Sequence, residues 1–238
     1  MLNRKILYGG LLAIGGVVIL TAIYIFLDRP RTVEGAIARG DVRALEKMLQ
    51  EERLETGPDS PHYLTYAINW RPSFYRRGRR ATDKQIARRN QISYDMVKLL
   101  VEHGADINRI HDYANLSPLM SAINRNMTEV VEYLLDNRAL VNVFAERQVS
   151  PLMIAVSVPS NIEIVKLLLD HNAKETINHT DHDGHTALHC AFNPRIVKLL
   201  LENTADPTIR NNAGQTPLEQ AREHNWTGKV AVLEKYME

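Results

Sequence analysis

The sequence of 238 residues lacks most features that would mark a disulfide-stabilised, nucleic-acid-binding or catalytic protein. Its single cysteine, Cys190, cannot form an internal disulfide, and one cysteine rules out a cysteine-based zinc finger. The formal net charge of +1 gives no reason to expect a nucleic-acid partner. We find no G-x-S-x-G elbow, no phosphate-binding P-loop, no G-x-G-x-x-G and no H-E-x-x-H. The sequence therefore predicts neither an enzyme nor a cofactor site.

Charge is also absent from the N-terminal region, where residues 6–27 contain no acidic or basic side chain. A helix of that length reaches roughly 33 Å, enough to cross the hydrocarbon core of a bilayer. The run ends in Leu27-Asp28-Arg29-Pro30, which offers no small-residue site for signal cleavage. We expect a tail at residues 1–5 and an uncleaved single-pass transmembrane helix, a signal anchor, at residues 6–27.

Two features of this segment bear on its orientation and contacts. Arg4 and Lys5 precede it and resemble the start of a signal sequence, which predicts a periplasmic repeat domain at a bacterial-type inner membrane. Arg39 and Arg43 lie further on and favour the opposite orientation. Glycines within the segment would allow close packing against another transmembrane helix.

The rest of the chain is repetitive. Similar segments begin at Ser117, Ser150, Thr186 and Thr216, and each opens a short helix with Ser or Thr as the N-cap. Proline takes the first helical position in three of them. A conserved-looking alanine follows in each segment, and a second helix with apolar residues at helical spacing comes next. These alanines are spaced 33, 36 and 30 residues apart: Ala122, Ala155, Ala191 and Ala221.

This pattern resembles the ankyrin repeat, whose period is about 33 residues and whose signature is T-P-L-H-x-A. The segment from Asp183 to His189 is close to that consensus, and two further repeats can be recognised upstream. The resemblance implies an all-α solenoid of about six helix-pair repeats with hairpin tips, over residues 28–238. The family turns left-handed after each second helix, which suits Gly104 and Asn172 but not Arg138 or Thr204.

A basic insertion at about residues 70–91 interrupts the second repeat. Ala67 and Met96 should be eight residues apart by the family spacing but are 29 apart, and the insertion has eight Lys and Arg residues against Asp83. Three interpretations stay open: a solvated loop, contact with anionic lipid, and an arm that binds an acidic protein. The last interpretation makes these residues contact candidates: Arg76, Arg77, Arg79 and Arg80.

Proteins of this family usually bind through the hairpin tips and the exposed face of the first helices. Carried over by position, that surface includes Ile110, Tyr113, Arg125, Phe144, Arg147 and His182. Phe144 has an alternative role, in which it packs against the neighbouring tip.

One stretch, from His179 to Cys190, is rich in residues that can bind metals. Its spacing is not that of a zincin helix, and the repeat itself explains Asp183 and His189, so we predict no metal site.

The resulting hypothesis is a membrane-anchored module that binds another protein. That partner could be a toxic enzyme such as a lipase, which the chain would inhibit as an immunity protein. The alternative is an accessory or assembly subunit of a membrane complex. A third interpretation, dominated by the basic insertion, is a protein that stabilises the lipid envelope.

Overall fold

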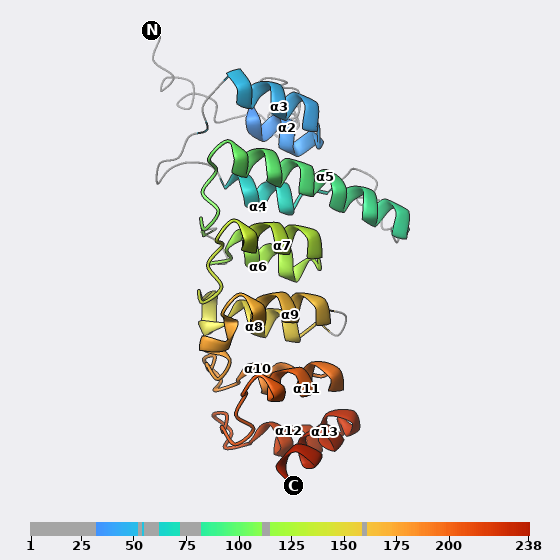
Figure 1. Cartoon of the computed structure of the whole chain (residues 1–238), viewed down its shortest axis with the longest axis vertical. Coiled ribbons are helices and arrows are strands. Elements are labelled where there is room, and N and C mark those ends of the chain that lie inside the picture. The colour runs from blue at the N-terminus through green and yellow to red at the C-terminus, as the bar shows by residue number, and fades with distance from the viewer. Residues whose placement is uncertain (1–31, 52–53, 55–61, 72–81, 111–114, 159–160) are drawn as a thin grey trace, which may run out of the picture.

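The computed structural model describes residues 32–51, 54, 62–71, 82–110, 115–158 and 161–238. Over these residues the regular structure is helical, and six helix pairs are stacked in a single column (Figure 1). Two short 3-10 turns lie beside the column, η2 (Glu146–Gln148) and η3 (Ala173–Thr176). The pairs are α2 (Val33–Arg39) with α3 (Val42–Glu51), α4 (Tyr63–Ile68) with α5 (Asp83–Glu102), α6 (Pro118–Asn124) with α7 (Thr128–Asp136), α8 (Pro151–Val156) with α9 (Ile162–Asp170), α10 (Ala187–Cys190) with α11 (Pro194–Glu202), and α12 (Pro217–Glu223) with α13 (Thr227–Met237).

The contacts between helices are those of a solenoid. Each helix packs against its partner in the pair and against the equivalent helices of the neighbouring repeats. One pair alone cannot bury its apolar face, so the stack shares one continuous core. The four repeat alanines are fully buried where the first helices meet, because a larger side chain would hold those helices apart. The predicted stack of about six helix pairs is confirmed.

The predicted N-caps are also confirmed. The hydroxyl of Ser117, Ser150, Thr186 or Thr216 accepts a hydrogen bond from the backbone N–H three residues later, at the start of α6, α8, α10 or α12. This bond satisfies one of the N–H groups that a helix start leaves without a partner.

The left-handed turn after the second helix occurs at all four predicted positions, whatever the residue type. The φ angle is +87° at Gly104, +68° at Arg138, +72° at Asn172 and +71° at Thr204. Thr204 is strained here, since a β-branched side chain crowds the backbone in the left-handed region.

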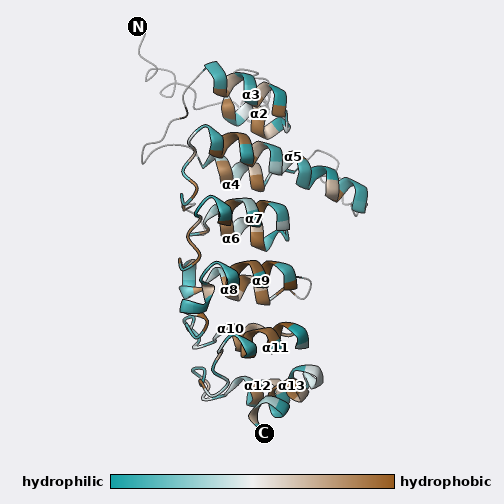
Figure 2. Cartoon of the chain, in the orientation of Figure 1, coloured by the Kyte–Doolittle hydropathy of each residue, from teal (hydrophilic) through white to brown (hydrophobic). Residues whose placement is uncertain are grey.

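The second repeat differs from the expected boundaries. Its second helix begins at Asp83, inside the basic insertion and well before Met96, so residues 83–91 of the insertion are helical and do not form a loop. Thr82 and Gln85 form a capping box, and strong helix formers such as Lys84, Ala87 and Arg88 follow. The resulting extension is hydrophilic and projects beyond the column (Figure 2).

The predicted membrane segment at residues 6–27 lies outside the described residues. Among the helices that are described, none combines the length and apolarity needed to cross a bilayer.

The fifth repeat is short, as its spacing predicts, because α10 has only four residues. Lys229 of α13 compensates for the missing turn: its Nζ donates to the backbone oxygen of His189 at 2.9 Å. The Lys229 side chain is fully buried and its Nζ lies 5.0 Å from the ring centroid of Trp226. Burial lowers the pKa of Lys229 to about 8.

Candidate functional site

The hairpin tips of the fourth, fifth and sixth repeats are joined edge to edge by hydrogen bonds. The N–H of His182 donates to the oxygen of Arg147 at 2.9 Å, and the N–H of Asn212 donates to the oxygen of Asp183 at 2.9 Å. The side-chain amide of Asn212 also donates to the oxygen of His182 at 2.8 Å. These bonds use the backbone of His182 and Asp183, so their side chains stay exposed on a fixed frame.

An ion pair reinforces the first of these junctions. The guanidinium of Arg147 lies 2.6 Å from a carboxylate oxygen of Asp183. This hydrogen bond lowers the pKa of Asp183 and raises the pKa of Arg147. Both side chains are exposed, so the pair orients the tips and adds little to the free energy of unfolding.

Phe144 takes the alternative role predicted for it. Its ring stacks on His179 of the next tip, with 4.0 Å between ring centroids, and is only partly exposed. The Nε2 of His179 lies 3.1 Å from the backbone oxygen of Gln148, which fixes the imidazole under Phe144. Ile110, in contrast, is 42% exposed.

On the face of the first helices, the guanidinium of Arg125 donates to the side-chain oxygen of Asn69 at 2.6 Å. This bond links the third repeat to the second and holds Arg125 at the surface. Two aromatic residues of the first-helix segments are also exposed: Tyr66 on α4, at 42%, and Phe192 just after α10, at 43%. Neither was predicted as a contact residue.

Most of the side chains between His179 and Cys190 that could bind a metal make hydrogen bonds or ion pairs within the repeats. Ligand atoms of Asp181, Asp183 and His185 lie within 4.8 Å of one another. Asp181, however, accepts the N–H groups of Asp183 and His185, and Asp183 pairs with Arg147. These bonds between protein groups hold the hairpin closed.

His189 and Cys190 lie nearby, but their side chains pack in the interior of the stack. The Nδ1 of His189 accepts from the N–H of Thr186, so its Nε2 carries the proton and donates to the oxygen of Gln215. Burial lowers the pKa of His189 and raises the pKa of the Cys190 thiol to about 11. The neutral thiol is a poor nucleophile and a poor ligand at neutral pH.

Five of the predicted contact residues lie outside the described residues. They are Arg76, Arg77, Arg79, Arg80 and Tyr113.

An apolar residue that the sequence analysis passed over is the most exposed large hydrophobic side chain of the described part. Leu140 follows the left-handed turn of the third repeat and is 54% exposed. Asp106 and Asp206 occupy the same position of the second and fifth repeats. Aligning the four turns by this position would have identified Leu140 from the sequence.

Comparisons with known proteins agree with the geometry of the stack. The family model described as "Ankyrin repeats (3 copies)" matches residues 84–145 and 152–234. A putative ankyrin repeat protein of Fowlpox virus (strain NVSL) is 39% identical over 174 residues, which cover 67% of this chain and 48% of the viral protein. The chain thus spans about half the length of this relative.

Proposed function

This chain belongs to the ankyrin-repeat family, and we propose that it binds another protein through its hairpin tips and the exposed face of its first helices. The proposal assigns it no catalytic role. The observation that carries the proposal is the ladder of tips from Arg147 to Asn212, in which backbone bonds fix the frame while side chains remain exposed. A surface fixed before binding loses less conformational entropy when a partner docks.

The exposed side chains on this surface suit a polar interface with a few apolar contacts. Ile110 and Tyr66 offer apolar area, while Arg125, Arg147 and His182 offer hydrogen-bond donors. Arginine and tyrosine are common where binding energy concentrates in protein interfaces.

The narrower proposal is that the uncharged segment at residues 6–27 anchors this module in a membrane, with the stack in the periplasm. An anchored inhibitor would be concentrated where a membrane-acting toxic enzyme, such as a lipase, attacks. The alternative, an accessory or assembly subunit, is favoured by the glycines of the same segment, which suit contact with another transmembrane helix. The basic insertion would assist either role at an anionic bilayer, because Lys84 and Arg88 are exposed on its helical part.

The test is affinity capture by the tagged full-length chain from gently solubilised membranes of its source cells, with bound proteins quantified by mass spectrometry. A tip variant carries Ile110→Asp, Glu146→Lys and His182→Glu, which alter exposed side chains and leave the backbone ladder intact. A matched control carries Lys166→Glu and Lys198→Glu on the exposed side of α9 and α11.

A stoichiometric partner that the tip variant loses and the control retains would support the proposal. A partner bound equally by all three proteins would refute recognition through the tips. The fragment 32–238 then separates the two narrower roles. An inhibitor should keep its partner without the anchor, whereas integral membrane proteins recovered only with the full-length chain would identify an assembly subunit.

A further inference from the structure

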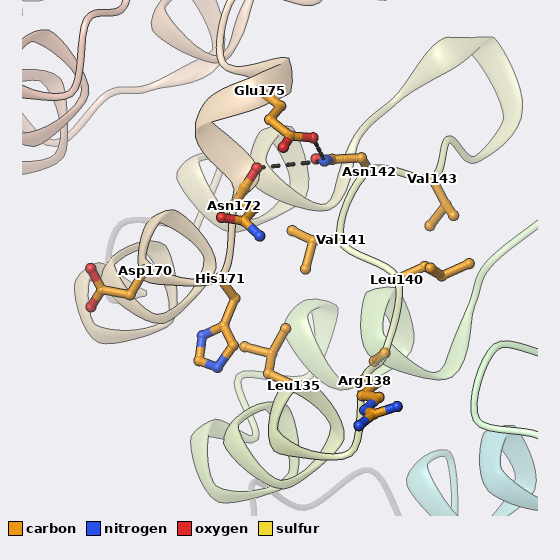
Figure 3. Close-up of a pocket in the computed structure, with 11 residues that line it drawn as sticks. Leu135, Arg138, Leu140, Val141, Asn142, Val143, Asp170, His171, Asn172 and Glu175 are labelled. Carbon is orange, nitrogen blue, oxygen red and sulfur yellow. Dashed lines mark hydrogen bonds between the residues drawn. The ribbon is translucent and has the colours of Figure 1, made fainter.

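A groove of about 470 Å³ opens between the third and fourth repeats, where α7 and α9 end. Its volume is within the range of clefts that bind small ligands. Leu135 and Val141 lie at its centre, Leu140 on one side and Asp170 on the other (Figure 3). None of the contact residues proposed above that the structure describes lines the groove, although its lining extends to Val143 at the start of the fourth repeat's tip.

The groove exists because the fourth repeat has two extra residues after its left-handed turn. Gly104 and Asn108 are separated by three residues, whereas Asn172 and Asn178 are separated by five, and η3 forms within these five residues.

The extra residues change how the repeats are joined. Asn108 accepts the N–H of Leu140 at 2.8 Å, and Asn178 accepts the N–H of Asp206 at 2.8 Å. Asn142, the equivalent asparagine at the groove, bonds η3 and its N-cap residue instead: it donates to the Glu175 carboxylate at 2.8 Å and to the backbone oxygen of Asn172 at 3.5 Å, and it accepts from the Thr176 hydroxyl at 3.0 Å (Figure 3). The short bond that Asn108 and Asn178 accept from a backbone N–H of the next repeat is thus replaced at the groove by bonds to η3 and a longer bond to Asn172.

The edge of the stack around the groove is acidic. The segments 99–108, 133–142, 167–178 and 199–208 end the second helices and form the turns after them. They carry seven carboxylates against Arg138 and Lys174, and two of the seven, Glu102 and Glu202, pair with Lys98 and Lys198 just before the segments. Two of the carboxylates line the groove itself, Asp170 and Glu175, against the cation Arg138, which lies near its Leu135 and Leu140 end (Figure 3). Such an edge attracts positively charged segments.

We propose that this groove binds an extended segment of a partner protein in which an apolar side chain lies next to a lysine or arginine. The apolar side chain would cover Leu140 and contact Leu135 and Val141, and the cation would lie between Asp170 and Glu175. This inference rests on the proposed function in that it takes the chain to bind proteins, but it assigns a surface distinct from the tips.

The test uses a displayed library of random peptides selected on the purified full-length chain in detergent. We expect enriched peptides to place an apolar residue beside lysine or arginine, and to bind more weakly at high salt. The affinity of a synthetic copy should fall at least about tenfold in Leu140→Asp, since it loses the burial of one leucine side chain. Asp170→Asn should weaken binding without changing the apolar preference.

Leu140→Asp is a conservative change for the fold. Its side chain is exposed, aspartate occupies the same position at Asp106 and Asp206, and the N–H that donates to Asn108 remains. Ile110→Asp is the matched control, because it removes a similarly exposed apolar side chain from a tip. Binding that Leu140→Asp abolishes and Ile110→Asp preserves would support the groove.

The opposite pattern, loss in Ile110→Asp alone, would place the peptides on the tips. It would overturn this inference while supporting the proposed function. Enriched peptides without a basic residue, or no enrichment at all, would also overturn the groove and leave the capture experiment on the tips to decide the proposed function.

Discussion

Replacing Lys229 by methionine should change the stability of the fold in a direction that depends on pH. The amine is fully buried, and no carboxylate in the described part of the chain lies within ion-pair distance of it. Its position in the first turn of α13 adds the positive end of a helix dipole to the unfavourable environment. Methionine preserves most of the side-chain length and volume while removing the charge.

The magnitude follows from two opposing effects. The fall in the pKa of Lys229 from 10.5 to about 8 corresponds to a cost of about 3 kcal/mol at neutral pH, at roughly 1.4 kcal/mol per unit. Methionine removes that cost. It also leaves the oxygen of His189 without its donor, which costs about 1–3 kcal/mol. At pH 7 the variant should therefore be as stable as the parent or more stable by up to about 2 kcal/mol.

At alkaline pH the stability difference between the parent and Lys229→Met changes sign. Between about pH 8 and 10.5 the unfolded chain binds more protons at Lys229 than the folded chain, so the stability of the parent rises with pH. The parent then keeps a neutral amine that still donates to His189, and the variant becomes the less stable by about 1–3 kcal/mol. Across this range the difference in the free energy of unfolding should change by about 3 kcal/mol.

Urea unfolding at several pH values, followed by tryptophan fluorescence and circular dichroism, measures this difference. Both proteins should carry Cys190→Ala, because the raised pKa of the thiol makes stability fall between about pH 9 and 11 and would obscure the effect. Lys235→Met controls for the loss of an exposed lysine from α13. If the free energy of unfolding depends on pH in the same way in the parent and in Lys229→Met, Lys229 does not carry a buried charge at neutral pH.

Three further changes test other parts of the stack by urea unfolding. Thr204→Gly should stabilise the fold by about 1 kcal/mol, because it relieves a β-branched residue at φ +71°, and Thr204→Ala should gain less. If neither variant is more stable than the parent, Thr204 is not strained at this position. Gly40→Ala should cost about 2–4 kcal/mol, since φ is +64° and the new Cβ would lie 2.3 Å from a ring atom of Trp70. The control, Gly104→Ala, meets no atom within 4 Å, and an equal loss there would exclude a clash as the cause. The lowered pKa of His189 predicts that stability falls as pH drops below about 6.5, where the unfolded chain takes up the proton first, and His189→Gln should reduce this loss. If His189→Gln loses as much stability at acid pH as the parent, His189 is not the cause of that loss.

The sequence predicts the parts of the fold that depend on short-range chemistry. A hydroxyl at an N-cap, a proline at the first helical position and an alanine at the same place in each repeat act within one helix pair or its nearest neighbours. The structure has them where the pattern puts them, at Ser117, Ser150 and Thr216 among others. The left-handed turn is so strongly imposed by the stack that Thr204 adopts it despite its side chain.

The features that escape prediction depend on contacts between residues far apart in the chain. Lys229 is an ordinary basic residue in the sequence, and its burial follows only from how α13 packs on α11 and α12, where its amine reaches His189, 40 residues away. The start of α5 at Asp83 also escapes the repeat spacing, because a local capping box decides it. Phe144 illustrates a third difficulty, since tip exposure and packing on His179 are equally compatible with its position.

Where the repeat is regular, its side chains are committed to holding the next repeat in place, as Asn108 and Asn178 are. Where residues are added, they form the projecting part of α5 and the turn η3. Where residues are missing, in the short fifth repeat, Lys229 bonds the end of α10. The first two create surface that the neighbouring repeats do not cover, and the third restores the core. Specific recognition by this stack should therefore concentrate at the exposed tips and at the additions, whereas the deletion should affect stability and leave binding unchanged.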